Sequence, residues 1–423
     1  MPSPSKRMVL AALCLVLIFA FTTANPSTAF AGSAGHASNC GLTVYHENYK
    51  DDAIQLALNQ AAKGKISPPT VCVSPGNYPE QLNITTVGGI SLIGMGLGNN
   101  LPIIDPSTVY ANTQTYGGFG QGAIIVAGIN GSAPPLTDIN VKNLIIDGAR
   151  ASSSPILTTC NDDYEGIEYY GASGTISNNL VENIYLPLAE AGCDLGGAIQ
   201  VHSTYPVAPV TVTVADNVLP NYGAGGILCA FVGVSCNITG NYLSYYTAYS
   251  PYTTSFGIAV ILGASAMVTG NSVSNDLCTE PSVCGPNPIT QSQSAGILTY
   301  DSATGTLVGG NRLTNNDIGV EDFVDNVTAL NNQVTDSTAA AILLADGVGT
   351  YVDGGNALSN SPVGVFVINF GDGTTFTSKL GFSNLFSGEP IHVEIETFSP
   401  GGATVDFRGK VYSLSGNMIL TLT

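Results

Sequence analysis

A recurring phrase constrains the fold of this chain more than any other feature of its sequence. The stretch GILTYDSATGTLVGGNRLTNNDIGVEDFVDNVTALNNQV shows it twice, as a Gly before a β-branched residue and, after a polar gap, an Asn before an apolar pair. Strand-like runs of this kind recur about 22 to 39 residues apart. They begin at Gly166, Ala198, Gly226, Gly257, Gly296, Gly319, Ala341 and Gly364.

A second series places one Asn between most consecutive runs. Its members are Asn143, Asn179, Asn217, Asn241, Asn271, Asn311, Asn332 and Asn356. A period near 22 suits a coil that returns to the same edge after each turn, so that each strand pairs in parallel with its copy. We expect each Asn to adopt the αL conformation at a bend and to bond the Asn one coil away. Few charges, many Gly and β-branched residues and no Trp also favour an all-β fold.

The N-terminal part of the chain carries a further pattern. Residues 51–62, DDAIQLALNQAA, predict an amphipathic helix with Asp51 or Asp52 as its N-cap and Gly64 at its end. A strand and turn of the form V-x-V-x-P-G-x-Y follow, and then L-x-G-x-G.

With the repeats, this opening resembles the right-handed parallel β-helix proteins of the pectin-lyase-like superfamily, over about residues 45 to 370. The resemblance implies a single-stranded right-handed parallel β-helix, a solenoid whose open end is capped by the helix. It does not imply one activity, because this fold hosts enzymes and adhesins alike.

The ends of the chain predict export and capping. Residues 1–31 read as a signal peptide, with Lys6 and Arg7 before an apolar run and AFA before Gly32; the alternative is a membrane anchor. We expect a linker over 32–50, the capped β-helix over 51–374, and a C-terminal β cap of antiparallel strands over 375–423. The alternative for the last part is a small separate domain. The mature protein is then extracellular or periplasmic, with no membrane partner after cleavage.

Cysteine count and charge agree with export. Eight Cys lie outside the predicted signal, and an even number in an exported chain suggests disulfides. Proximity in sequence pairs them as Cys40 with Cys72, Cys160 with Cys193, Cys229 with Cys236, and Cys278 with Cys284. The net charge of −19 argues against nucleic acid and anionic membranes as partners.

One acid-rich stretch is the best candidate for chemistry. If the Ile after each Gly points inward, the next residue points outward, and stacking of coils brings Glu168 near Gln200 and Tyr170 near His202. Glycosidases need two carboxylates flanking the scissile bond. The alternatives are a solvated acidic loop or a calcium site. We expect no cofactor unless this last alternative holds and the stretch binds calcium. The candidate catalytic residues are Asp162, Asp163, Glu165, Glu168 and His202.

Aromatic residues suggest where a sugar binds. Flat rings stack on sugar faces, so Tyr170 and, in a Tyr-rich loop, Tyr245, Tyr246 and Tyr249 are candidate substrate-binding residues; the alternative for the loop is packing. A second acidic cluster, with Asp322 pointing inward, reads mainly as polar residues at bends. Its members are Asp301, Glu321, Asp322, Asp325 and Asp346.

The outward positions of the later coils are apolar, including Leu228, Leu298, Leu343 and Phe366. Either a loop or tail covers this stripe, or it forms an interface, as in a homo-oligomer.

Two functions remain open. Between residues 66 and 378 the only cations are Lys142, Arg150 and Arg312, which is poor equipment for a polyanionic substrate. The motifs of polygalacturonases and pectin methylesterases are also missing. The first hypothesis is a secreted β-helix that binds or cleaves a neutral or weakly charged polysaccharide, as a carboxylate-dependent glycoside hydrolase. The second is a non-catalytic adhesive scaffold.

Overall fold

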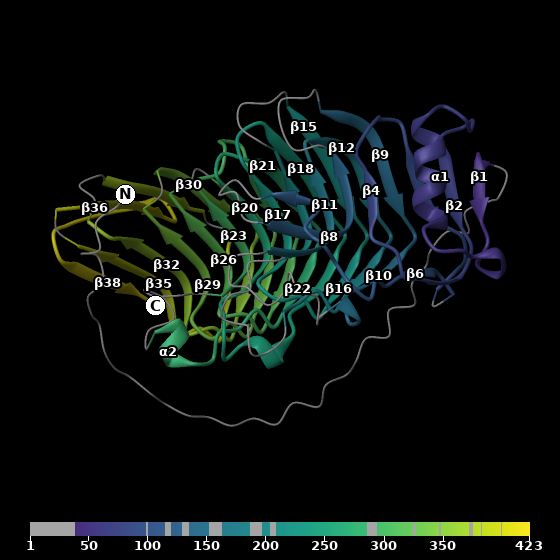
Figure 1. Cartoon of the computed structure of the whole chain (residues 1–423). Coiled ribbons are helices and arrows are strands. Elements are labelled where there is room, and N and C mark those ends of the chain that lie inside the picture. Colours follow the sequence, from purple (N-terminus) through teal and green to yellow (C-terminus); the bar gives the residue numbers. More distant parts are fainter. Residues whose placement is uncertain are drawn as a thin grey trace.

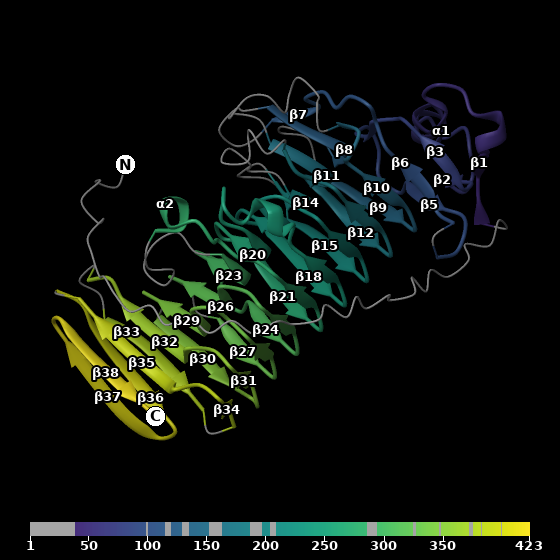
Figure 2. The same ribbon diagram turned by 90° about the horizontal axis from the view of Figure 1, so that it is seen from below.

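The chain winds into a long stack of coils with three parallel sheets along its length (Figure 1). The structure, a computed structural model, describes residues 39–98, 100–114, 120–128, 135–151, 163–186, 197–203, 209–285, 294–324, 327–346, 348–371, 375–381, 383–398 and 400–423. Each coil contributes one strand to each sheet, and neighbouring strands of a sheet come from successive coils (Figure 2). This is the predicted parallel β-helix.

The strands fall into sheets A, B and C. Sheet A contains β1 (Leu42–Val44), β2 (Thr70–Val73), β5 (Ser91–Gly94), β9 (Leu136–Lys142), β12 (Ala172–Ser177), β15 (Val210–Ala215), β18 (Val234–Thr239), β21 (Ser265–Thr269), β24 (Leu307–Gly309), β27 (Thr328–Leu330), β30 (Val348–Asp353), β33 (Thr375–Leu380), β36 (Gly402–Phe407) and β37 (Lys410–Ser415). Sheet B contains β3 (Gly76–Tyr78), β6 (Pro102–Ile104), β10 (Ile145–Asp147), β13 (Leu180–Glu182), β16 (Val218–Pro220), β19 (Tyr242–Ser244), β22 (Ser272–Ser274), β25 (Arg312–Thr314), β28 (Gln333–Thr335), β31 (Ala357–Ser359) and β34 (Leu385–Ser387). Sheet C contains β4 (Leu82–Ile84), β8 (Gly120–Gly128), β11 (Asp163–Tyr170), β14 (Gly197–His202), β17 (Gly225–Ala230), β20 (Phe256–Ile261), β23 (Ala295–Tyr300), β26 (Ile318–Phe323), β29 (Ala340–Ala345), β32 (Val363–Asn369), β35 (Ile391–Thr397) and β38 (Met418–Leu422), with β7 (Thr113–Gln114) on β8.

Stacked aliphatic side chains fill the coil interior. In sheet C, Ile167 lies in register with Ile199, and Ile199 with Ile227, and all three are fully buried. The expected inward direction of the Ile after each Gly is therefore confirmed, and the residue that follows it points outward. This alternation fixes which side chains lie on the outer face of sheet C.

The Asn series forms an internal hydrogen-bonded ladder. From Asn179 onward, the side-chain Nδ2 of each member donates to Oδ1 of the next at 2.8 to 3.1 Å, and the ladder continues past the predicted series to Asn384. The expected αL conformation is confirmed at Asn143, with φ 56°, but from Asn179 to Asn356 it belongs to the preceding residue, as at Asn178 with φ 55° and Asn331 with φ 54°.

The N-terminal cap is helix α1 (Ala53–Ala62), preceded by the 3-10 turn η2 (His46–Asn48). Asp52 occupies the N-cap position, but its side chain makes no capping hydrogen bond. The buried Glu80 carboxylate accepts instead from the backbone N–H groups of Ile54 and Gln55, at 3.0 and 2.9 Å. The predicted N-cap position is therefore confirmed at Asp52, but the capping oxygens belong to Glu80, a carboxylate of the next coil. Gly64 follows the helix with φ 65°, as expected.

Both ends differ from the expected boundaries. Strand β1 lies within the predicted linker and pairs in parallel with β2. At the other end, β33, β34, β35 and β36 still pair in parallel with the preceding coil, so the solenoid continues where antiparallel strands were expected. The antiparallel pairings are those of β37 on β36 and β38 on β35. Alternating apolar and polar residues suit either pairing, so the pattern could not separate them.

Three of the four predicted disulfides are confirmed: Cys40–Cys72, Cys229–Cys236 and Cys278–Cys284. Cys160 and Cys193 lie outside the described residues, as does the predicted signal peptide. Disulfides are typical of oxidising, exported compartments. Within the described part of the chain, no helix is both long and apolar enough to cross a membrane.

Candidate functional site

Polar side chains gather on the outer face of sheet C in the early coils. The strands β8, β11 and β14 lie side by side there, with Glu168 in register with Gln200 and Tyr170 with His202, as the stacking argument predicted. The polar and aromatic residues of this face are Gln121, Asp163, Glu165, Glu168, Tyr170, Gln200 and His202.

The centre of this group is a carboxylate held on both oxygens. Glu168 Oε1 lies 2.7 Å from His202 Nε2, and Thr113 Oγ1 on β7 donates to Glu168 Oε2 at 2.7 Å. The Tyr170 ring stacks on the His202 ring, with centroids 4.3 Å apart. Glu168 has no exposed surface, and His202 and Tyr170 are 2% exposed. The pair is an ion pair whenever the imidazole is protonated.

Two further carboxylates precede Glu168 on the same strand. Asp163 lies in register with Gln121, and Gln121 Nε2 donates to Asp163 Oδ2 at 3.5 Å. Glu165 is fully buried, and its Oε2 accepts from the backbone N–H of Gly197 at 2.9 Å. Glu165 therefore fixes the start of β14, a positioning contact. Asp162, the other candidate acid, lies outside the described residues.

The side chains of this face can transfer protons, and they can form hydrogen bonds to hydroxyl groups. A carboxylate and an imidazole at 2.7 Å can exchange a proton, and Asp163 supplies a second carboxyl on the same face. Because Thr113 packs over a fully buried Glu168, a substrate reaches that carboxylate only after the Thr113 contact opens.

The Tyr-rich loop is mostly part of the core. Tyr245 and Tyr249, the latter in the turn η6 (Thr247–Tyr249), are 2% and 0% exposed. Tyr246 is partly exposed, and its ring stacks on Tyr185 with centroids 4.8 Å apart. The contact geometry matches the packing alternative for Tyr245 and Tyr249; their role in sugar binding stays a prediction.

The second acidic cluster splits across the sheet. Asp322 points inward as expected, where Thr299 Oγ1 and Thr350 Oγ1 donate to its two oxygens at 2.9 and 2.7 Å. Glu321 points outward and is 6% exposed. Burial raises the pKa of Glu321 to about 8, helped by the nearby Asp322, and raises the pKa of Asp322 to about 6. Asp325 lies outside the described residues.

The later outward stripe is a buried apolar cluster, separate from the coil interior. Phe323 and Phe370 pack against it with ring centroids 6.0 Å apart. Its buried members are Ala295, Ile318, Ala339, Ala340, Leu343, Ala345, Val363, Phe366 and Ile368. The outer face of sheet C thus changes from polar to apolar along the solenoid.

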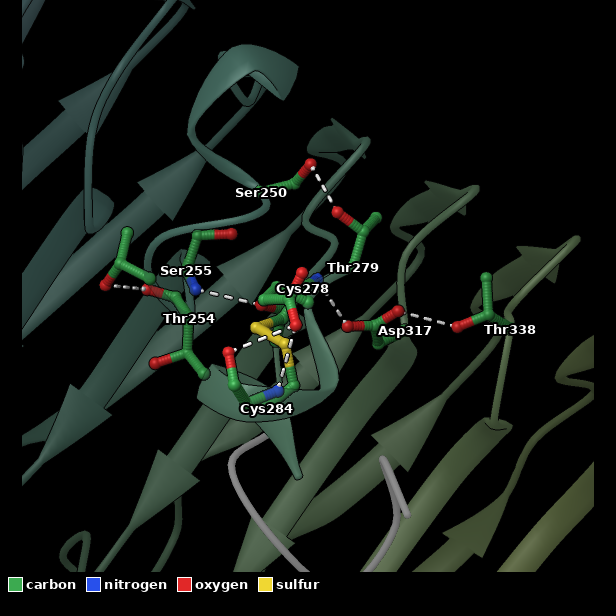
Figure 3. Close-up of a disulfide and its surroundings, with 12 residues drawn as sticks. Ser250, Thr254, Ser255, Cys278, Thr279, Cys284, Asp317 and Thr338 are labelled. Atoms are coloured by element: carbon green, nitrogen blue, oxygen red, sulfur yellow. Dashed lines mark hydrogen bonds between the residues drawn. A yellow bond between two sulfur atoms is a disulfide. The ribbon is translucent and has the colours of Figure 1, made fainter. Parts of the chain in front are cut away.

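A buried acid pair beside a disulfide was missed by sequence reasoning. Asp317 accepts from Cys278 N at 2.7 Å and from Thr338 Oγ1 at 2.6 Å, next to the short helix α2 (Pro281–Cys284) (Figure 3). Asp276, fully buried, accepts from the Tyr222 hydroxyl at 3.0 Å, and burial raises its pKa well above the usual range. Asp276 and Asp317 are each isolated acidic residues in a turn, so no pattern in the sequence indicates that they come together. Their contacts anchor the turn that carries Cys278.

A metal site is not evident in the described ranges, where no three His, Cys, Asp or Glu side chains are grouped to hold an ion. Calcium binding, which was considered for the stretch containing Asp162, stays a prediction.

The comparisons with known proteins concern the fold. No family model matches this chain, and no curated protein matches its sequence. The native GH136 lacto-N-biosidase of Eubacterium ramulus is similar in structure, with 11% identity, a TM-score of 0.50, and 87% of this chain and 68% of that chain covered. The A-module of a mannuronan C-5 epimerase of Azotobacter vinelandii has 16% identity, a TM-score of 0.47, and coverage of 88% and 96%. A surface adhesin of Streptococcus pneumoniae, PfbA, has 12% identity, a TM-score of 0.45, and coverage of 90% and 98%.

With its continuous parallel sheets and one strand per sheet in each coil, this chain is a right-handed parallel β-helix protein.

Proposed function

We propose that this protein is exported and that it binds and cleaves an extracellular polysaccharide on the outer face of sheet C. The observation that carries the proposal is the meeting of Glu168, His202 and Tyr170 from two successive coils, with Asp163 on the same strand. Carboxyl and carboxamide groups beside an aromatic ring are the groups that bind sugar hydroxyls and sugar faces.

The role of each residue follows from its position. Glu168 is the proposed general acid or base of a glycoside hydrolase. Glu165, three residues earlier and about 10 Å along the strand, is the nearest second carboxyl, whereas Asp163, about 17 Å away, would bind a sugar beside the scissile bond. His202, whose Nε2 lies 2.7 Å from Glu168 Oε1, would hold that carboxyl in a fixed orientation. Gln200, in register with Glu168, would hold a substrate hydroxyl. Net negative charge favours a neutral or weakly charged glycan.

A screen of the purified protein against neutral and acidic glycans tests this function. It scores binding and product release for the wild type, Glu168→Gln and Asp163→Asn, with the exposed Glu47→Gln as a matched control. Product release that is lost in either site variant, with binding kept, supports the hydrolase. Product release that survives in both variants refutes the assigned carboxylates, and no binding to any glycan refutes the function.

The second candidate is a non-catalytic adhesive scaffold. The burial of Glu168, His202 and Tyr170 favours it, because side chains that are at most 2% exposed are poorly placed to act on a polymer. The apolar cluster on the later coils is itself buried, so it offers little exposed surface for a partner. Glycan binding without turnover in the same screen would support this candidate.

A further inference from the structure

A pocket at the N-terminal end of the solenoid is separate from the carboxylate site. It lies between helix α1 and the end of β4, and its volume is about 260 Å³. Sites for drug-sized ligands start at about 300 Å³, so this pocket suits a smaller molecule, of the order of one sugar ring.

The lining of the pocket is neutral and of two kinds. Leu58, Ile84 and Ile90 form its floor, each at most 2% exposed, and Ala62 adds a partly exposed methyl group. Amide and hydroxyl side chains supply the rest: Gln55, Asn59, Asn83, Thr85 and Thr86. Apolar surface beside several uncharged donors and acceptors matches a sugar ring, which presents C–H groups on its face and hydroxyls at its rim.

The amides are held in place before any ligand arrives. Gln55 Nε2 donates to Asn59 Oδ1 at 3.1 Å and to the backbone carbonyl of Asn83 at 3.0 Å. Gln55 Oε1 accepts from the Asn83 backbone N–H at 2.7 Å. Fixed side chains lose little entropy on binding, which favours affinity.

Several polar groups in this pocket keep free hydrogen-bonding capacity. Within the described residues, no hydrogen bond is made by Nδ2 of Asn59, Nδ2 of Asn83, or the hydroxyls of Thr85 and Thr86. These are donors and acceptors in a concave site with no charged residue in its lining. Because no lining residue carries a charge, the pocket offers no ion-pair partner and favours a neutral ligand.

We propose that this pocket binds a single neutral sugar residue. It lies close to the carboxylate face. Asn112 Nδ2 donates to Asn83 Oδ1 at 3.2 Å, and its neighbour Thr113 donates to Glu168. Asn83 also pairs with Val126, which pairs with Glu168, so two strand spacings of about 4.8 Å each separate them. Sugar binding at this pocket would add a second binding site to the proposed carbohydrate function, but it does not depend on catalysis at Glu168.

Calorimetric titration with glucose, galactose, mannose and xylose tests the pocket. The variants are Asn59→Leu and Thr86→Val, which remove polar groups from the lining, and Glu168→Gln at the other site. Asn237→Leu, an exposed Asn on β18, is the matched control. We expect at least one sugar to bind the wild type, with at least tenfold weaker binding in Asn59→Leu or Thr86→Val, and unchanged binding in Asn237→Leu. Glu168→Gln measures how much of the sugar binding belongs to the carboxylate face.

Two results would refute sugar binding at this pocket. One is the absence of binding to all four sugars. The other is binding that survives both pocket substitutions, and if that binding is lost in Glu168→Gln it belongs to the carboxylate face. Failure of the glycan screen with success of this titration would remove the proposed hydrolase and leave the pocket standing.

Discussion

Replacing Glu321 by Gln should raise the free energy of unfolding by an amount that depends on pH. Glu321 lies on the outer face of β26, between Leu298 and Leu343 of the neighbouring strands, and is 6% exposed. Its Oε2 has no hydrogen-bond partner among the described residues. Burial first, and Asp322 second, raise its pKa from 4.5 to about 8.

The sign follows from proton binding. The pKa of Glu321 is higher in the folded state, so the folded protein binds more protons than the unfolded chain between pH 4.5 and about 8. The contribution of Glu321 to stability is therefore most favourable below pH 4.5 and falls as pH rises through this window, by about 1.4 kcal/mol per pH unit. Between about pH 5 and about pH 7, the wild type loses about 3 kcal/mol through this group. Gln stays neutral and escapes the loss.

Urea unfolding followed by circular dichroism at both pH values measures the effect. The gap in stability between Glu321→Gln and wild type should widen by about 3 kcal/mol from about pH 5 to about pH 7. Glu47→Gln, at an exposed position, should show no such widening. A gap that stays constant with pH, or narrows as pH rises, would refute the reasoning about burial.

Other predictions concern the solenoid itself. Asn271→Ala should cost about 3 kcal/mol, because it leaves buried ladder partners unpaired, whereas the exposed Asn237→Ala should cost under about 0.5 kcal/mol; denaturant unfolding compares them. Replacing Cys40 and Cys72 by Ala removes a disulfide with a sequence separation of 32 and should lower the free energy of unfolding by about 4 kcal/mol, because the unfolded chain gains loop entropy. Denaturant unfolding without a reducing agent should show this as a lower midpoint for the variant than for the wild type. Val324→Asn should stabilise by about 1 kcal/mol, because Val324 has φ 68° and is 49% exposed, and a lower midpoint would contradict the strain argument.

The repeat predicted the fold well because its physics is local. A Gly before a β-branched residue and an Asn between runs recur in each coil, and the structure places them as inward Ile and ladder Asn. The bend residue before the ladder Asn varies among Asn, Asp and Gly from Asn179 to Asn356, so its αL role was assigned one position too late. The C-terminal boundary was missed because strands buried on one face alternate in the same way whether they pair in parallel or antiparallel.

The site was predictable where it depends on register alone. The stacking of Tyr170 on His202 follows from coil spacing, and the structure confirms it. The contact of Thr113 with Glu168 could not be predicted, because Thr113 lies 55 residues earlier on a strand outside the repeat. The same holds for Glu80 at helix α1 and for Asp317 beside Cys278, where long-range contacts decide the role of an isolated acid.

The carbohydrate function is tested most directly by a crystal structure with the glycan that binds most tightly in the screen. We expect sugar density on the outer face of β8, β11 and β14, within hydrogen-bonding distance of Glu168, Asp163 or Gln200, and with Thr113 moved away from Glu168. Density on the apolar outer face of β26, β29 and β32, with Glu168 still held by Thr113 and His202, would contradict it.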